Sequence, residues 1–129
     1  MYTSSVFLKT VEFVDRKRHS LSLGDALEKL KQSFQSEMKD CPSGLNRQVF
    51  TYFLGPAGAS PEITNDLVER AHKLGDVIDL FAGEYNDQND DFTEEEWLFL
   101  KECASEYAEE MDMQVLTAVM SRIMDRGLL

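Results

Sequence analysis

The longest helical pattern in the sequence runs from Asp91 to Gly127, and it constrains the fold more than any other stretch. Thr93 followed by Glu96 is a capping-box pattern, which fixes the first turn of a helix. Apolar residues then recur at helical spacing on one face, and acidic residues lie on the opposite face. The apolar face comprises Leu100, Cys103, Ala104, Tyr107 and Met111, and the acidic face comprises Glu95, Glu102, Glu106, Glu109 and Glu110. This spacing predicts an amphipathic helix over residues 93–111.

The apolar residues change phase after Asp112. The later apolar set consists of Val115, Leu116, Val119, Met120 and Ile123. At roughly 100° per residue, this set is rotated by more than a quarter turn from the earlier face. Because one straight helix would have to bury two different faces, we expect a break near Asp112, whose side chain can cap the last helix. Arg126 and Gly127 are typical of a helix C-terminus.

Four shorter helical patterns precede this stretch. A helix is expected over Ser5–Arg18, and the basic residues at its end suit the negative end of the helix dipole. Ser22 and Asp25 resemble a capped helix start, and the following apolar face comprises Leu23, Leu27, Leu30, Phe34 and Met38. A short helix is expected over 45–54. Ser60 and Pro61 are typical of a helix start, and an apolar stripe then runs from residue 63 to 81.

The fold class follows from these patterns. At 129 residues the chain is long enough for one domain over 1–129, and we predict an all-α, single-domain bundle of about five helices. An α+β alternative stays open, because residues 5–14 and 47–54 are also rich in β-branched and aromatic residues. The two cysteines, Cys41 and Cys103, are too few for a disulfide framework and are read as reduced thiols.

The net charge of −11 sits in one segment. Residues 84–112 contain twelve acids and one base, Lys101, whereas the remainder contains twelve acids and twelve bases. A field of this sign repels nucleic-acid backbones and attracts basic partners. No stretch approaches the length of a membrane span, and the N-terminus does not resemble a signal peptide. We therefore expect a cytoplasmic protein whose partner is another protein with a basic surface, not nucleic acid or a membrane; a homo-oligomer is also compatible with the sequence.

Signals for catalysis, cofactors and metals are weak in this chain. It has neither two suitably placed histidines nor a glycine-rich phosphate loop, so no catalytic residue and no cofactor is predicted. A calcium-binding EF-hand loop starting at Asp87 would need Gly at its sixth position and Glu at its twelfth. Those positions hold Phe92 and Leu98, so the loop at 86–91 is expected to be a solvated turn, and no metal site is predicted.

His72 lies in the sequence Ala71-His72-Lys73-Leu74-Gly75. This segment resembles the histidine phosphotransfer domain, a small four-helix bundle with a motif of the form AHxLKG. The resemblance implies that His72 is an exposed phospho-acceptor, with Lys73 nearby and Gly75 leaving the ring uncrowded. In this chain Lys73 precedes the leucine and the glycine comes one position early. The alternative is an exposed histidine with Asp76 as its helical neighbour.

Asp91–Trp97, together with Leu100, resembles the opening of the Krüppel-associated box, an interaction motif of transcriptional repression. Tyr107 and Met111 lie one place out of register with that motif. The chain also lacks zinc-finger spacing of Cys and His. Shared helix-start chemistry explains the similarity, so no function is carried over.

The sequence therefore favours a non-enzymatic regulatory module: an adaptor, chaperone or inhibitor that binds its partner through the acidic C-terminal helices. A phosphotransfer module is the alternative. The methionines of the C-terminal region are either an adaptable binding groove or plain core. The residues predicted to contact the partner are Glu102, Glu106, Glu109, Glu110, Met113 and Met120.

Overall fold

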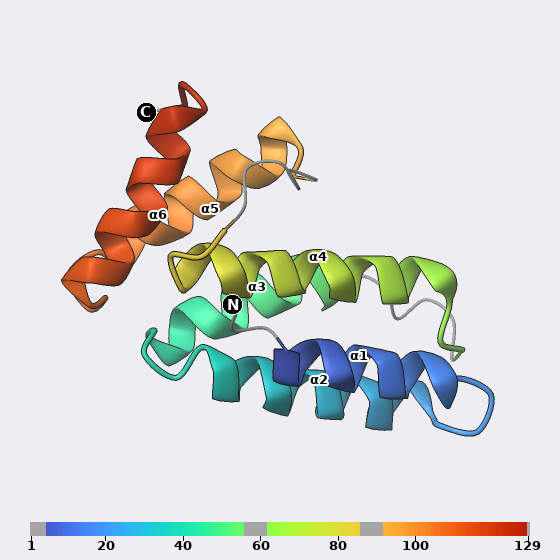
Figure 1. Cartoon of the computed structure of the whole chain (residues 1–129). Helices are drawn as coiled ribbons and strands as arrows, with labels where there is room; N and C mark the ends of the chain where they lie inside the picture. Colours follow the sequence, from blue (N-terminus) through green and yellow to red (C-terminus); the bar gives the residue numbers. More distant parts are fainter. Residues whose placement is uncertain (1–4, 56–61, 86–91, 129) are drawn as a thin grey trace.

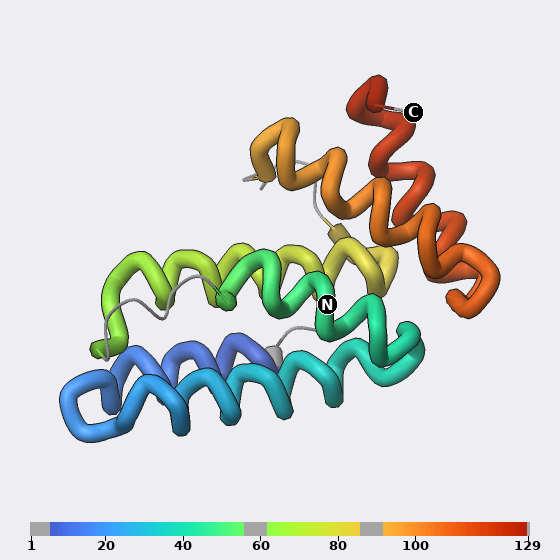
Figure 2. Tube along the Cα trace, turned by 180° about the vertical axis from the view of Figure 1, so that it is seen from behind, coloured from blue at the N-terminus to red at the C-terminus, as the bar shows by residue number. Residues whose placement is uncertain are grey.

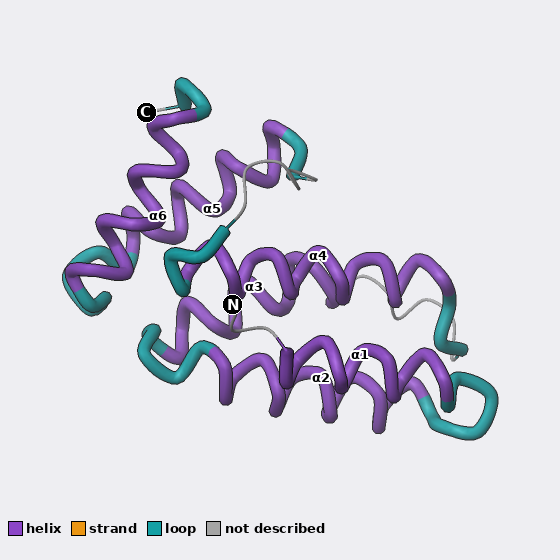
Figure 3. Tube along the Cα trace, in the orientation of Figure 1, coloured by secondary structure: helices purple, strands orange, loops and turns teal. Residues whose placement is uncertain are grey.

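The computed structural model describes residues 5–55, 62–85 and 92–128, and in these ranges the chain forms six α-helices and no strand (Figures 1 and 3). The helices are α1 (Ser5–Arg16), α2 (Leu23–Glu37), α3 (Ser43–Leu54), α4 (Asn65–Phe81), α5 (Glu94–Glu106) and α6 (Met113–Asp125). The all-α prediction is confirmed, with one helix more than the five expected. The α+β alternative is not needed, because residues 5–14 and 47–54 lie in α1 and α3.

Helices α1 to α4 run alternately in opposite directions and form a four-helix bundle (Figures 1 and 2). Within it, α1 packs on α2 and α4, and α3 packs on α2 and α4. Helices α5 and α6 form a hairpin that crosses one end of the bundle. In this hairpin α5 packs on α3, and α6 packs on α4. The long acidic stretch therefore builds a separate layer on top of the bundle.

Within the bundle, side-chain caps define the starts of α2 and α4. Ser22 Oγ accepts a hydrogen bond of 3.1 Å from Asp25 N, as predicted for the start of α2. The predicted start of α4 at Ser60–Pro61 is wrong, because the helix begins at Asn65, and residues 60 and 61 lie outside the described ranges. Thr64 caps α4 instead, since its Oγ1 accepts from Leu67 N at 3.2 Å. The buried Ile63 lies just before this cap, where an apolar residue can fix the direction of the incoming chain.

Basic residues lie at the end of α1 and in the turn that follows it. α1 ends at Arg16, two residues earlier than predicted, and a turn follows. The Arg18 guanidinium pairs with Asp15 and also donates a 2.6 Å hydrogen bond to Asn65 Oδ1 at the start of α4. Arg16 lies in the last turn of α1, as expected for a charged helix end, and Arg18 joins the turn after α1 to the start of α4.

The core is one cluster of buried side chains drawn from all six helices. At its centre Phe34 packs edge-on against Phe7, with ring centroids 6.2 Å apart. The buried Asn46 links two helices, because its Nδ2 donates a 3.1 Å hydrogen bond to the carbonyl oxygen of Met38 at the end of α2. None of the helices in the described ranges has the length and apolar character needed to cross a membrane.

Candidate functional site

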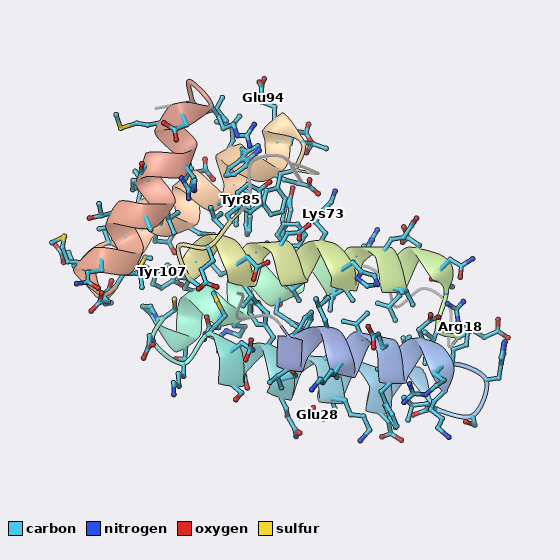
Figure 4. All side chains as sticks on the ribbon, in the orientation of Figure 1. Arg18, Glu28, Lys73, Tyr85, Glu94 and Tyr107 are labelled. Atoms are coloured by element: carbon cyan, nitrogen blue, oxygen red, sulfur yellow. The ribbon has the colours of Figure 1, made fainter. Side chains whose placement is uncertain are left out.

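The capping box predicted at the start of α5 is present. Thr93 Oγ1 accepts from Glu96 N at 3.1 Å, and Glu96 Oε1 accepts from Thr93 N at 2.8 Å. The Glu96 carboxylate also pairs with Lys73 of α4, at N–O distances of 3.1 and 3.2 Å. Figure 4 shows Lys73 rising from α4 toward the hairpin. Glu96 therefore fixes the start of α5 and ties it to the bundle.

Aromatic rings hold the inner face of α5. Trp97 is 3% exposed and packs edge-on against Tyr85 and Phe92, with ring centroids 5.6 and 5.0 Å away. The Arg126 guanidinium from the end of α6 lies over the same indole ring at 5.1 Å, within cation–π range. On α3, Tyr52 stacks on Phe99 with ring centroids 3.9 Å apart. These contacts leave the opposite face of α5 pointing to solvent.

A polar joint secures the other end of α5 to α3. Gln48 Nε2 donates to Glu106 Oε2 and to Tyr107 Oη, both at 3.1 Å. Tyr107 packs so closely on Gly44 that an added Cβ there would lie 2.9 Å from the phenol oxygen. Partial burial, followed by the charge of Glu106, raises the pKa of Tyr107. The sequence patterns gave no signal for Gln48 and Gly44, because such a joint depends on how α3 and α5 are placed.

The predicted break near Asp112 is confirmed. Helix α5 ends at Glu106, and residues 107–110 form turns, so the helix is shorter than the predicted 93–111. Asp112 then caps α6, since its Oδ1 accepts from Gln114 N at 2.9 Å. Met111 is buried at 7% exposed although it lies outside the helix. The break allows α5 and α6 to bury different faces, as the change of phase required.

Four of the predicted partner-binding residues form an exposed acidic patch: Glu102, Glu106, Glu109 and Glu110. Within the described ranges no lysine, arginine or histidine forms a salt bridge with any of the four. Lys101 is directed elsewhere, because its ammonium donates a 2.8 Å hydrogen bond to the carbonyl oxygen of Leu128. Glu102 and Glu106 are one helical turn apart, a spacing at which like charges repel. The patch is therefore a negative surface whose carboxylates form no salt bridge within the described residues.

The buried thiol of Cys103 lies beneath this patch. Burial, followed by the charges of Glu106 and Glu102, raises the pKa of Cys103 to about 12. Its Sγ also donates to Gln48 Oε1 at 3.6 Å. The thiol stays protonated at neutral pH, so Cys103 belongs to the core of the hairpin and not to a reactive site.

The C-terminal methionines differ in burial, and their role in binding stays a prediction. Met113 is 72% exposed and Met124 is 63% exposed, whereas Met120 is half-buried against the core. These three share one face of α6, because their spacings of seven and eleven residues are close to whole helical turns. Met111, by contrast, is core. α6 thus offers an apolar strip that begins beside the acidic patch.

His72 is exposed on α4, as the phosphotransfer reading requires. Two of its neighbours make contacts with other helices. Lys73 is engaged by Glu96, and Gly75 is buried against α1, where an added Cβ would lie 3.4 Å from Leu8. Gly75 therefore serves close helix packing rather than access to the imidazole ring. The role of His72 as a phospho-acceptor stays a prediction.

The predicted solvated turn at 86–91 lies outside the described ranges. Within those ranges no three side chains of His, Cys, Asp or Glu gather as a metal ion would need. Comparisons with protein-family models, curated proteins and solved structures found no match. Neither of the two short resemblances therefore extends to a matching family, and a functional assignment has to be argued from the surface described above.

Proposed function

We propose that this protein is a non-enzymatic interaction module that binds a basic partner protein through the α5–α6 hairpin. The acidic patch carries this proposal: Glu102, Glu106, Glu109 and Glu110 are exposed, and none forms a salt bridge within the described residues. Uncompensated charge of one sign speeds the encounter with an oppositely charged surface and selects against like-charged ones. Cytoplasmic location, and the role of adaptor, chaperone or inhibitor, are parts of the same proposal.

The methionine strip supplies the apolar component of this surface. Met113 comes three residues after Glu110 of the acidic patch, and Met120 and Met124 continue along the same face of α6. Methionine side chains are flexible and polarisable, so they adapt to partners of different shape. An acidic patch next to an exposed apolar strip suits a partner segment that is both basic and apolar, such as an amphipathic helix.

Charge reversal tests the proposal. The triple variant Glu102→Lys, Glu109→Lys and Glu110→Lys is expected to lose the partners that the wild-type protein captures from its native lysate at low salt, as identified by mass spectrometry. The matched control reverses Glu12, Glu28 and Glu69, which are exposed on the bundle and give the same change in net charge. Circular dichroism verifies that both variants keep their helicity.

The dependence of capture on salt concentration is a second test of the proposal. Surface charges are screened over about 8 Å at physiological ionic strength and about 3 Å at 1 M. Capture by the wild type is therefore expected to weaken as salt rises. Equal capture by the patch variant and by the control would refute this surface as the binding site.

A further inference from the structure

A cavity of about 590 Å³ lies where three helix ends meet. One of its lining residues, Asp112, closely follows the turn that carries Glu109 and Glu110. The three helix ends are the C-terminal ends of α2 and α4 and the start of α6, which gather at one side of the molecule (Figure 1). The volume falls in the range of about 300–1,000 Å³ that is common for binding pockets. The sequence patterns did not predict it, because its walls come from three separate segments.

The walls of the cavity combine two kinds of surface. The apolar part comprises Met38, Ile78, Phe81 and Val115. The charged part comprises Glu37, Asp40 and Asp112, and no lysine, arginine or histidine lines the cavity. Within the described residues none of these three carboxylates forms a salt bridge. The cavity therefore has both polar and apolar walls, and every charged side chain that lines it is acidic.

The carboxylates retain unused hydrogen-bonding capacity. Glu37 Oε2 is buried and has no hydrogen-bond donor in the described structure. Asp112 uses only Oδ1 for its cap on α6. A buried acceptor without a donor costs about 1–3 kcal/mol, so a donor brought in from outside would be favourable here.

The thiol of Cys41 also lines the cavity, where it is partly buried beside Asp40 and Asp112. Burial, followed by the charges of Asp40 and Asp112, raises the pKa of Cys41 to about 11. Burial also raises the pKa of Glu37. Burial is the main cause of both shifts, and for Cys41 the two neighbouring carboxylates add to it.

We infer that this cavity receives an arginine side chain of the basic partner. The inference rests on the proposed function, because the same partner would cover the acidic patch next to it. An arginine stem is apolar and can pack on the half-buried Val115 and Ala118 of the cavity wall, while its planar guanidinium offers five donors to carboxylate oxygens. An anion would be repelled, and a purely apolar group would leave the three carboxylates uncompensated.

The test uses protein labelled with ¹³C at its methionine methyl groups. Met38 lines the cavity, whereas Met124 lies exposed at the far end of α6, so their signals separate the cavity from the outer surface. The probe is a short helical peptide with arginine on one face and leucine on the other. Peptides with lysine or neutral citrulline in place of arginine serve as comparisons. We expect the Met38 signal to shift with the arginine peptide, less with lysine, and not with citrulline.

A double variant, Asp40→Asn and Asp112→Asn, tests the carboxylates themselves. Asparagine is as good a helix cap as aspartate, so α6 keeps its start while the cavity loses two charges. The affinity for the arginine peptide is expected to fall about tenfold or more, the lower end of what close charge pairs contribute. The control, Glu12→Gln and Glu28→Gln, removes two exposed charges from the bundle and is expected to bind nearly as well as wild type.

The outcomes separate the two proposals. Shifts at Met113 and Met124 without a shift at Met38 would overturn the arginine cavity and leave the hairpin surface standing. Equal responses to the arginine and citrulline peptides, or to the arginine and lysine peptides, would also overturn it. The absence of any shift at low salt would contradict both the cavity and the hairpin surface.

Discussion

Helix α4 buries eight of its seventeen residues, whereas α6 buries two of its thirteen. The bundle helix has neighbours on several sides, and its buried set includes residues from both ends of the helix. The hairpin helix holds its place mainly through Val119 and Ile123 and leaves Met113 and Met124 in solvent. The comparison indicates that the bundle contributes most of the stability, whereas the hairpin leaves more of its side chains accessible.

The largest expected effect comes from breaking the bundle side of this comparison. Phe34→Ala removes a fully buried ring that packs against Phe7 and Phe50, so we expect a loss of about 3–5 kcal/mol in the free energy of unfolding. Met113→Ala, on the hairpin, should change it by less than about 0.5 kcal/mol, because that side chain is 72% exposed. Urea unfolding measures the free energy of unfolding of both variants. Similar losses for the two would contradict the difference between the bundle and the hairpin.

The joint between the two regions is the next target. Gly44→Ala places a Cβ against Tyr107 and displaces its ring from Gln48. We expect the free energy of unfolding, measured in urea, to fall by about 1–3 kcal/mol. Gly24→Ala is the matched control, since Gly24 is likewise the second residue of its helix and an added Cβ there has no neighbour within 4 Å. That control should gain about 0.5–1 kcal/mol from helix propensity. A gain at both positions would show that the joint is not tightly packed.

Alkaline pH is expected to weaken the structure through both thiols. The pKa of Cys103 is raised to about 12 and that of Cys41 to about 11, above the ordinary value of 9.0. Because the folded state holds these protons more tightly, stability is complete below about pH 9 and falls as pH rises toward 11–12. The slope is at most about 1.4 kcal/mol per pH unit and thiol. Urea midpoints across this window should fall less steeply for Cys103→Ala, and an unchanged slope would argue against the shift.

The smallest effect concerns the acidic patch. Glu102→Gln removes the repulsion with Glu106 one turn away. We therefore expect the free energy of unfolding, measured in urea, to rise by about 0.2–0.5 kcal/mol. High salt should abolish this gain, because it screens the repulsion already. Glu12→Gln is the control, since Glu12 lies one turn from Arg16 and should lose slightly instead. A gain at Glu12 as large as that at Glu102 would indicate a general effect of net charge.

Local patterns in the sequence predicted the helices and several of their caps. Ser22, Thr93 and Asp112 were identified as caps because capping acts over two or three residues of chain. The exposed acidic face was predictable for the same reason, since helical periodicity is local. Ser60 and Thr64 both offer a hydroxyl ahead of the apolar stripe, so the local pattern alone does not show that Thr64 is the cap of α4.

Contacts between distant segments could not be predicted in this way. Gln48 meets Tyr107 across 59 residues of chain, and Gly75 meets α1 although nothing near it in sequence indicates this. The cavity at the ends of α2, α4 and α6 has the same origin. Its acids are spread over the chain, and only the packing of the helices brings Glu37 and Asp112 to one place.

The repulsion between Glu102 and Glu106 has a consequence for how binding can be detected. A ligand that binds only the folded state raises the melting temperature, and the rise grows with the logarithm of the ligand concentration above its dissociation constant. A cation bound at the patch would additionally relieve the repulsion between the two carboxylates. The thermal transition of this protein should therefore respond to multivalent cations such as spermine at concentrations where singly charged cations act only by screening, and the size of that upshift would provide a simple assay for occupants of the hairpin surface.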